Sequence, residues 1–353
     1  MPQKHKIVFL YTELAAYFLS CVDALINSGR AELHVFRWPL NKEAPFDFKF
    51  HPEIKLYERK NFNQMQLQQE VDKINPDLIF CSGWVDKGYK KVCKKYCKSI
   101  PVIVGIDNHW TGEFKQRIAS ALSGLLVRKY FNKAWVPGKA QIEFAQKLGF
   151  DSKDILTGFY SADTNYFNHF YSLYKDEKKN KFPHRFIYVG RYLHFKGIYE
   201  MWDAFCELQT ENPNDWELWC LGTGAEYEKR KEHPSIKHFG FVQPEEIKNF
   251  IRDAGIFVLP STFEPWGVVV HEFAASGFPI IATEKVGAAS EFVVNAENGF
   301  IFEAGKKDQL KMCLKKCMSM TDSELNEMGR KSHEQAQKIT PEKWAVKLLE
   351  TLT

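Results

Sequence analysis

Two glutamates separated by seven residues stand where the sequence predicts a turn and the start of a helix. Glu264 precedes Pro265, which stiffens the turn, and a helix is expected from about Gly267 to Gly277. Glu272 then lies about one and a half turns into the helix, so the two carboxylates are too far apart to share a proton. Ionised carboxylates accept hydrogen bonds from hydroxyl groups, and a pair of oxygens suits a vicinal diol. The pair indicates a sugar or ribose ligand, with the alternative that each glutamate only stabilises the helix N-terminus.

Two cations follow another apolar run, residues 186–189. Arg191 and Lys196 flank a strand-to-helix turn that begins at Gly190. Arginine suits bidentate contacts with phosphate and lysine supplies a point charge, while the N–H groups of residues 266–268 at the start of the glutamate helix favour anions. Together they predict a site that neutralises a diphosphate without a metal ion. The alternative is a pair of solvated loop cations.

The first half of the chain contributes one candidate at the end of a strand-like run. His109 follows the apolar residues 102–106 and stands between Asp107 and Trp110. Its ring could hydrogen-bond a substrate hydroxyl, and a purely structural histidine is equally compatible with this position.

Two further sequence patterns bear on which cofactors and metals the site could use. Gly222 and Gly224 follow a third strand-like run and would permit close backbone approach to a ligand, but the full dinucleotide fingerprint G-x-G-x-x-G is missing there. No D-x-D sequence occurs, which disfavours a divalent metal bridging a nucleotide diphosphate to paired aspartates. We therefore expect no cofactor and no metal.

The elements that must position these residues alternate between apolar runs and amphipathic stretches, which is typical of parallel sheets covered by helices. The pattern predicts an α/β fold of two doubly wound domains, with a site in a cleft at the carboxyl ends of the strands. We expect an N-terminal domain at 1–165, a polar linker at 166–183, a second domain at 184–335, and a terminal helix at 336–353. A solvated loop inside one domain is the alternative for the linker.

Composition excludes several classes of protein. The 353 residues are 44% hydrophobic and 26% charged, values typical of a globular protein. A net charge of +4 is too small for a dedicated nucleic-acid binder. No apolar run approaches the roughly 20 residues of a membrane span, no signal peptide is recognisable, and the eight cysteines are scattered, so we expect a reduced, cytoplasmic chain.

The stretch from Glu264 to Glu272 resembles the E-x7-E motif of retaining GT-B glycosyltransferases, in particular glycosyltransferase family 4. The likeness continues through Gly190-Arg191, Lys196-Gly197 and the segments 279–282 and 287–291, and it is strong from about residue 184 to 305. The first 165 residues are less similar, and the loop at 11–16 lacks the glycine-rich turn common in the family.

The resemblance implies a GT-B architecture of two Rossmann-like domains facing a central cleft, with the terminal helix crossing back to the first domain. It places the donor diphosphate at Gly190, Arg191 and Lys196. It assigns the transferred sugar and phosphate to Glu264 and the backbone of Trp266-Gly267-Val268, the ribose to Glu272, and the reaction centre to His109.

The activity implied is a metal-independent, hexosyltransferase-type transfer with retention, from a UDP- or GDP-linked sugar to a glycan or lipid-linked acceptor, in surface polysaccharide or glycoconjugate synthesis. A sugar-nucleotide epimerase of the same architecture and a catalytically silent sugar-nucleotide or glycan-binding homologue remain as alternatives.

A lysine-rich segment raises the question of a membrane partner. Residues 89–98 carry five lysines around Val92 and Tyr96 in what the spacing predicts to be a helix. Such a basic face is typical of peripheral contact with an anionic membrane and equally of a solvated helix. The sequence leaves both interpretations open.

Overall fold

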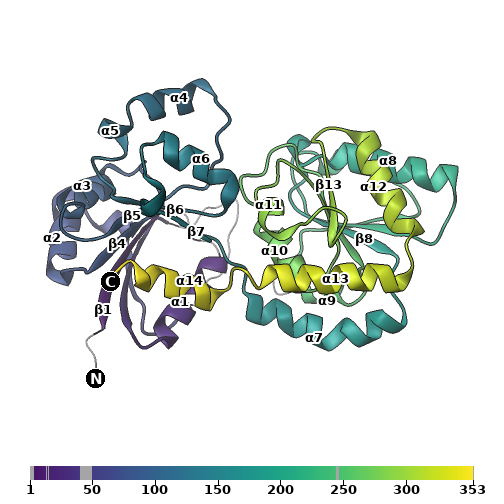
Figure 1. The fold of residues 1–353 in the computed structure, drawn as a ribbon, viewed down its shortest axis with the longest axis horizontal. Helices are drawn as coiled ribbons and strands as arrows, with labels where there is room; N and C mark the ends of the chain where they lie inside the picture. The colour runs from purple at the N-terminus through teal and green to yellow at the C-terminus, as the bar shows by residue number, and fades with distance from the viewer. Residues whose placement is uncertain (1–3, 13, 15, 40–49, 244–245, 353) are drawn as a thin grey trace. The chain divides into compact units, whose positions relative to one another are not determined.

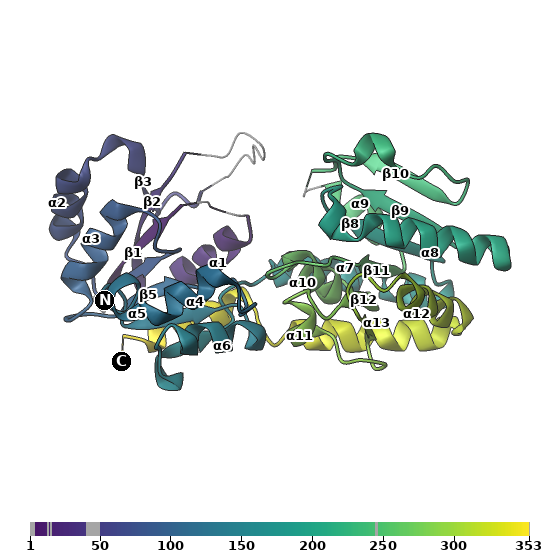
Figure 2. The same cartoon turned by 90° about the horizontal axis from the view of Figure 1, so that it is seen from above.

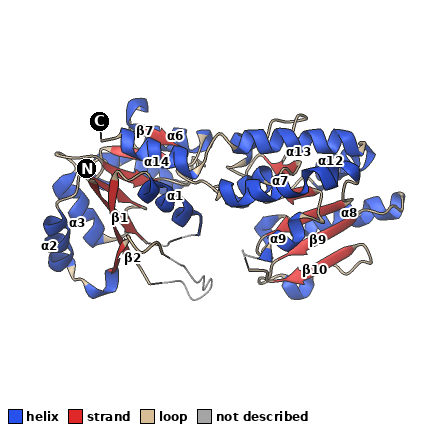
Figure 3. Cartoon of the chain, turned by 90° about the horizontal axis from the view of Figure 1, so that it is seen from below, coloured by secondary structure: helices blue, strands red, loops and turns tan. Residues whose placement is uncertain are grey.

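The computed structural model describes residues 4–12, 14, 16–39, 50–243 and 246–352. The chain divides into unit 1, Met1–Asp163 with Ile339–Thr353, and unit 2, Thr164–Lys338. Each unit is a parallel β-sheet with helices packed on it (Figures 1 and 3). The predicted fold class, two Rossmann-like α/β domains, is confirmed.

Unit 1 contains a parallel sheet in the order β3-β2-β1-β4-β5-β6-β7. Its strands are β1 His5–Tyr11, β2 Ala31–Arg37, β3 Lys55–Glu58, β4 Leu78–Cys81, β5 Val102–Gly105, β6 Lys133–Val136 and β7 Ile155–Thr157. Its helices are α1 Ala16–Asn27, α2 Gln64–Ile74, α3 Lys87–Tyr96, α4 Phe114–Ala121, α5 Ser123–Leu126, α6 Lys139–Lys147 and α14 Pro341–Glu350.

The two faces of this sheet bury different residues because successive side chains of a strand point to opposite sides. Val8 and Leu10 of β1 pack with α2, α3 and α6, whereas Ile7 and Phe9 pack with α1 and α14. In the second cluster Trp344 of α14 is buried, and its indole N–H donates to the Phe159 carbonyl at 2.9 Å. The C-terminal helix is thus part of the core of unit 1.

Unit 2 contains a parallel sheet in the order β10-β9-β8-β11-β12-β13. Its strands are β8 Arg185–Val189, β9 Glu217–Leu221, β10 Ile236–Gly240, β11 Ile256–Leu259, β12 Ile280–Thr283 and β13 Gly299–Phe302. Its helices are α7 Thr164–Asn180, α8 Ile198–Glu211, α9 Lys248–Ile251, α10 Val268–Ala275, α11 Ala289–Phe292, α12 Lys307–Ser319 and α13 Asp322–Ala336. Figure 2 shows α8 lying along β8 and β9.

The segment expected to be a linker, residues 166–183, is mostly helix. It forms α7, which packs against α10 and α13 and places Phe167, Phe170 and Lys178 in the interior. The polar run near its end hid this helix because the sequence shows no apolar periodicity there, and tertiary contacts supply the stabilisation that the local pattern lacks.

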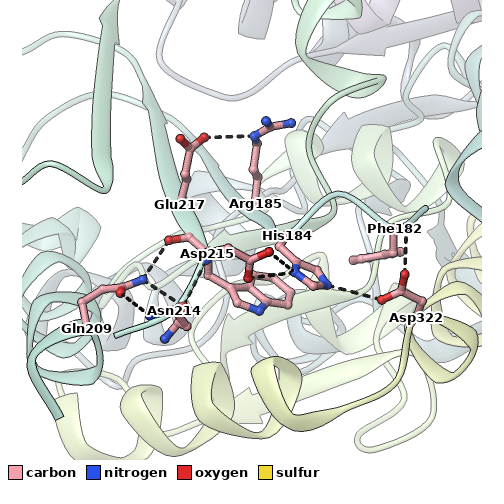
Figure 4. A network of polar contacts seen from close by, with 9 residues as sticks. Phe182, His184, Arg185, Gln209, Asn214, Asp215, Glu217 and Asp322 are labelled. Carbon is pink, nitrogen blue, oxygen red and sulfur yellow. Dashed lines mark hydrogen bonds and ion pairs between the residues drawn. The ribbon is translucent and has the colours of Figure 1, made fainter. Parts of the chain in front are cut away.

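A polar network joins the amino end of β8 to its neighbours (Figure 4). The His184 Nδ1 lies 3.0 Å from both carboxylate oxygens of Asp215, and its Nε2 lies 3.3 Å from Asp322 Oδ1. The imidazole stacks on Trp216, with 4.8 Å between ring centroids. Asp322 also accepts the Phe182 N–H at 3.2 Å. This network ties α13 and the loop before β9 to the beginning of β8.

Three further expectations concern disulfide bonds, membrane-spanning helices and the loop at 11–16. None of the eight cysteines, all in described parts of the chain, forms a disulfide. Among the described residues, no helix is long and apolar enough to cross a bilayer. The glycine-free loop at 11–16 includes residues 13 and 15, which lie outside the described residues.

Candidate functional site

The glutamate helix begins directly after a glycine that no other residue could replace without strain. Gly267 has φ +85°, and a Cβ there would lie 3.0 Å from Glu264 Cγ. The Val270 N–H donates to the Gly267 carbonyl at 3.0 Å, which tightens the first turn of α10. The N–H groups of Val268 and Val269 have no acceptor within the helix, because the first N–H groups of any helix have no carbonyl group one turn before them. α10 therefore begins with backbone donors next to a carboxylate.

The turn before α10 is fixed to the segment after β12. The Gly287 N–H donates to the Glu264 carbonyl at 3.1 Å, and the Ala288 N–H donates to the Trp266 carbonyl at 2.8 Å. Trp266 is buried and its ring packs edge-on against Phe292 of α11. These contacts hold Glu264 at the carboxyl end of β11.

Lys196 forms an ion pair with Glu264, and both side chains are largely buried, 12% and 16% exposed. The backbone brings them together. Both the N–H and the hydroxyl of Thr262 donate to the Phe195 carbonyl, at 2.8 and 3.1 Å. Gly197 has φ +68°, and a Cβ there would approach the Pro260 carbonyl oxygen to 2.1 Å. The loop after β8 therefore rests on the loop after β11.

The Gly190 turn is supported by the neighbouring loop after β9. A Cβ on Gly222 would lie 1.9 Å from the Gly190 carbonyl oxygen, and one on Gly224 would lie 2.4 Å from that of Tyr192. The Tyr192 N–H donates to the Thr223 carbonyl at 2.8 Å. In the structure, the close backbone approach that these two glycines permit is to the loop after β8.

Arg191 is exposed on the Gly190 turn, and a buried tyrosine holds its backbone. The Tyr188 hydroxyl donates to the Arg191 carbonyl at 2.8 Å. Burial raises the pKa of Tyr188 well above its ordinary value, and the Glu264 carboxylate acts in the same direction. Tyr188 therefore remains a neutral hydrogen-bond donor, a role that its position in an apolar strand did not reveal.

Glu272 and His109 occupy separate elements. Glu272 lies half-buried in the second turn of α10, beside the buried His271, whose Nε2 lies 2.9 Å from the Ala336 carbonyl oxygen. His109 belongs to unit 1, after β5, and its carbonyl accepts the side-chain N–H of Gln116 at 2.8 Å. The structure thus brings Lys196 and Glu264 together, whereas His109 lies in the other unit.

Metal-ligating side chains do not cluster in the part of the chain that the structure describes: no group of three or more His, Cys, Asp or Glu residues is arranged to hold an ion. The groups available to an anionic ligand are cationic side chains and the backbone donors of α10. These are the groups that bind phosphate oxygens in proteins.

Comparison with known proteins finds a family match within unit 2. Residues 172–337 match the family model described as glycosyl transferases group 1. This part of the chain is therefore similar to group 1 glycosyltransferases. Within curated proteins, the chain is 29% identical over 124 residues to a glycogen synthase of Mycobacterium tuberculosis H37Rv, a match that covers 33% of this chain and 30% of that protein. It is 27% identical over 129 residues to the lipopolysaccharide 1,6-galactosyltransferase of Escherichia coli K12, covering 34% and 35%. These matches thus span about a third of each curated relative.

Solved structures extend the likeness from residues 172–337 to the fold of both units. Anabaena Alr3699/HepE, solved in complex with UDP and glucose, is similar with a TM-score of 0.70 and 17% identity, covering 99% of both chains. A glycosyltransferase of Rickettsia africae has a TM-score of 0.73 and 12% identity, covering 99% and 98%. At such identities the comparison establishes the GT-B fold.

Proposed function

We propose that the protein is a retaining, metal-independent glycosyltransferase of family 4 that moves a hexose from a UDP- or GDP-linked sugar to a glycan or lipid-linked acceptor, in surface polysaccharide or glycoconjugate synthesis. One observation carries the proposal. Lys196 and Glu264 form a largely buried pair at the carboxyl ends of β8 and β11, beside the first turn of α10. Carboxyl ends of parallel strands are where such folds bind ligands. The UDP and glucose in the Anabaena structure support a nucleotide-sugar donor.

The donor diphosphate is assigned to Arg191, Lys196 and the backbone donors at the start of α10. Arg191 is exposed and can reach two phosphate oxygens in a bidentate contact. The Lys196 ammonium has three hydrogens, so it can keep its bond to Glu264 while it contacts a phosphate. Glu264 and residues 266–268 would hold the transferred sugar, and Glu272 would accept the ribose hydroxyls.

The reaction we infer is a front-face transfer with retention. The bond between the anomeric carbon and the diphosphate oxygen breaks, the acceptor oxygen bonds to that carbon from the same face, and the acceptor proton passes to the departing phosphate oxygen. Arg191, Lys196 and the α10 backbone stabilise the charge on the leaving group. His109 of unit 1 is assigned to the sugar at the reaction centre. Positioning and preorganised charge supply the acceleration.

The first experiment identifies the donor. Thermal unfolding is measured with UDP, GDP, ADP and their sugar conjugates, with and without EDTA, because a ligand at 100 times its Kd stabilises a protein by about 2.7 kcal/mol. We expect one nucleotide family to raise Tm, with an equal shift in the chelator. No shift with any nucleotide would contradict donor binding, and a shift lost in EDTA would contradict metal independence.

The second experiment tests the residues and the reaction. With the donor so identified, Arg191→Ala and Lys196→Ala should each lower kcat/KM by about 100-fold or more. Lys237→Ala is the matched control, because Lys237 pairs with Glu217 at 2.6 Å at the amino ends of β10 and β9. Proton NMR of the product should show retention at the anomeric carbon. Full turnover by the two variants, or an epimerised sugar nucleotide as product, would contradict the proposal.

A further inference from the structure

The segment formed by α4 and α5 presents its polar side to the protein and its apolar side to solvent. Neither helix has a buried side chain. On the inner side, the Gln116 amide N–H donates to the His109 carbonyl at 2.8 Å, and the Ser120 hydroxyl donates to the Lys147 carbonyl at 2.7 Å. Ala119, between them, packs against the core of unit 1. Small and polar side chains therefore attach α4, the reverse of an ordinary surface helix.

The outer side carries a cluster of large apolar residues that we call the α4–α5 patch. Its members are between 37 and 76% exposed: Phe114, Ile118, Leu122, Leu125 and Leu126. The first three are four residues apart, so they lie along one face of the helical segment. Figure 1 shows α4 at the outer margin of unit 1. Clustered exposure of this kind marks an interaction surface.

Basic residues accompany the patch. Lys115 and Arg117 flank Phe114 and Ile118 on α4, and Lys129 follows α5, whereas Glu113 is the one acidic residue in the segment 113–129. This gives the patch an apolar row with a cationic border.

The lysines of α3 extend this border. The Cys97 thiol donates to the Lys129 carbonyl at 3.4 Å, and the Lys90 ammonium lies 5.4 Å from the centroid of the Tyr130 ring. Lys91 and Lys94 of α3, and Lys98 just after it, are exposed. α3 itself buries Tyr89, Val92 and Cys93, so it supplies charge without an apolar surface of its own.

We propose that the α4–α5 patch docks unit 1 on an anionic lipid surface, with the apolar row inserted among the acyl chains and the lysines against the headgroups. An apolar face with a basic border is the pattern of helices that lie in a membrane interface. A second copy of this chain is disfavoured, because a symmetric contact would place the two cationic borders together. A bilayer also needs no complementary shape to receive apolar side chains that project from a convex helix. The inference concerns docking and does not depend on the proposed reaction.

Vesicle co-sedimentation of the full chain, without any sugar nucleotide, tests this proposal. We expect binding to phosphatidylcholine–phosphatidylserine vesicles at low salt, weaker binding at high salt, and little binding to phosphatidylcholine alone. The triple variant Phe114→Ser/Ile118→Ser/Leu125→Ser should lower the affinity about tenfold or more. Its Tm should be unchanged, because the replaced side chains are exposed.

Lysine variants and two matched controls on unit 2 separate the apolar contribution to binding from the electrostatic one. Leu173→Ser/Met312→Ser removes side chains of comparable exposure from unit 2 and should bind as the unchanged chain does. Lys91→Ala and Lys94→Ala should each weaken binding about fivefold at low salt, whereas Lys315→Ala on α12 should not.

Four outcomes would overturn the proposal. The folded chain could fail to bind anionic vesicles at low salt, or it could bind them with full affinity in the triple serine variant. In the third outcome, the chain binds no vesicles and instead self-associates through the patch. Light scattering would then show a dimer for the unchanged chain and a monomer for the triple variant. That result would assign the face to a second copy. Retention by an immobilised acidic protein without vesicle binding would likewise exclude the lipid.

Discussion

Lys178 of α7 provides a quantitative test of how burial acts on a charge in unit 2. The side chain is 7% exposed, its ammonium donates to the Ala254 carbonyl at 2.8 Å, and it lies 3.8 Å from the centroid of the Phe278 ring. Burial lowers the pKa of Lys178 from 10.5 to about 7, although the carboxylates of Asp253 and Glu177 act in the opposite direction. The amine is therefore expected to titrate near neutral pH in the folded chain.

The sign of the effect on stability follows from the bound protons. Between pH 7 and 10.5 the unfolded lysine keeps its proton while the folded one has lost it, so the unfolded state binds more protons and stability rises with pH. Below the folded pKa both states are protonated and the penalty of burial is complete. From pH 7 to pH 9 the lysine should add about 2 kcal/mol to the free energy of unfolding.

Urea unfolding of three chains at pH 7, 8 and 9 measures this contribution. Lys178→Met removes the titrating group, and Lys179→Met changes an exposed lysine at the next position of the same helix. Buried tyrosines and cysteines also titrate towards high pH, but equally in all three chains, so their effect cancels in the differences. The unchanged chain and Lys179→Met should gain about 2 kcal/mol relative to Lys178→Met between pH 7 and 9.

Parallel curves would refute this reasoning. If the unchanged chain and Lys178→Met differ by the same amount at each pH, to within about 0.5 kcal/mol, the ammonium keeps its proton throughout. The Ala254 carbonyl and the Phe278 ring would then outweigh the loss of hydration.

Three other predictions concern two glycines of unit 2 and the C-terminal helix of unit 1. Gly267→Ala forces a side chain into φ +85° and 3.0 Å from Glu264 Cγ, so it should destabilise unit 2 by about 1–3 kcal/mol and abolish most turnover, measured by Tm and product formation. Trp344→Ala should cost unit 1 about 3–5 kcal/mol in urea unfolding, because it empties a buried site stacked on Trp135; a loss below about 1 kcal/mol would contradict the placement of α14. Gly222→Ala should lower Tm without any ligand, because its Cβ would meet the Gly190 carbonyl oxygen at 1.9 Å; Gly83→Ala, where a Cβ meets nothing within 4 Å, is the control.

The central strands of both sheets were predictable, whereas the edge strands were not. The apolar runs at 78–81, 102–106, 186–189, 256–259 and 280–282 predict strands. They form β4, β5, β8, β11 and β12, which are apolar almost throughout because helices cover both faces. The sequence pattern predicts no strand at β3 and β7 in unit 1 or at β10 and β13 in unit 2, which are the edges of the two sheets. β10 alternates buried or half-buried residues with exposed ones, and β3 has two exposed residues followed by two half-buried ones, so their sequences are hard to distinguish from polar loops.

For α4 and α5, the sequence pattern indicates an amphipathic helix but does not determine which of its faces packs against the protein. Phe114, Ile118 and Leu122 have the spacing of a core-facing helix, yet their side chains are exposed. Periodicity indicates that one face differs from the other. Which face meets the protein depended here on partners such as the Lys147 carbonyl, distant in the chain.

For the candidate site, the sequence by itself determined the local parts. Apolar runs that end in Gly190-Arg191 or before Glu264, followed by helix-starting glycines, place these residues at strand ends through short-range propensity and turn geometry. Only the tertiary structure decided which strand ends meet. β8 pairs with β11 as well as with the next strand in the chain. This pairing brings Lys196 close to Glu264, although the two residues are 68 positions apart in the sequence. Strand order depends on how the helices cover the whole sheet, so no local pattern encodes it.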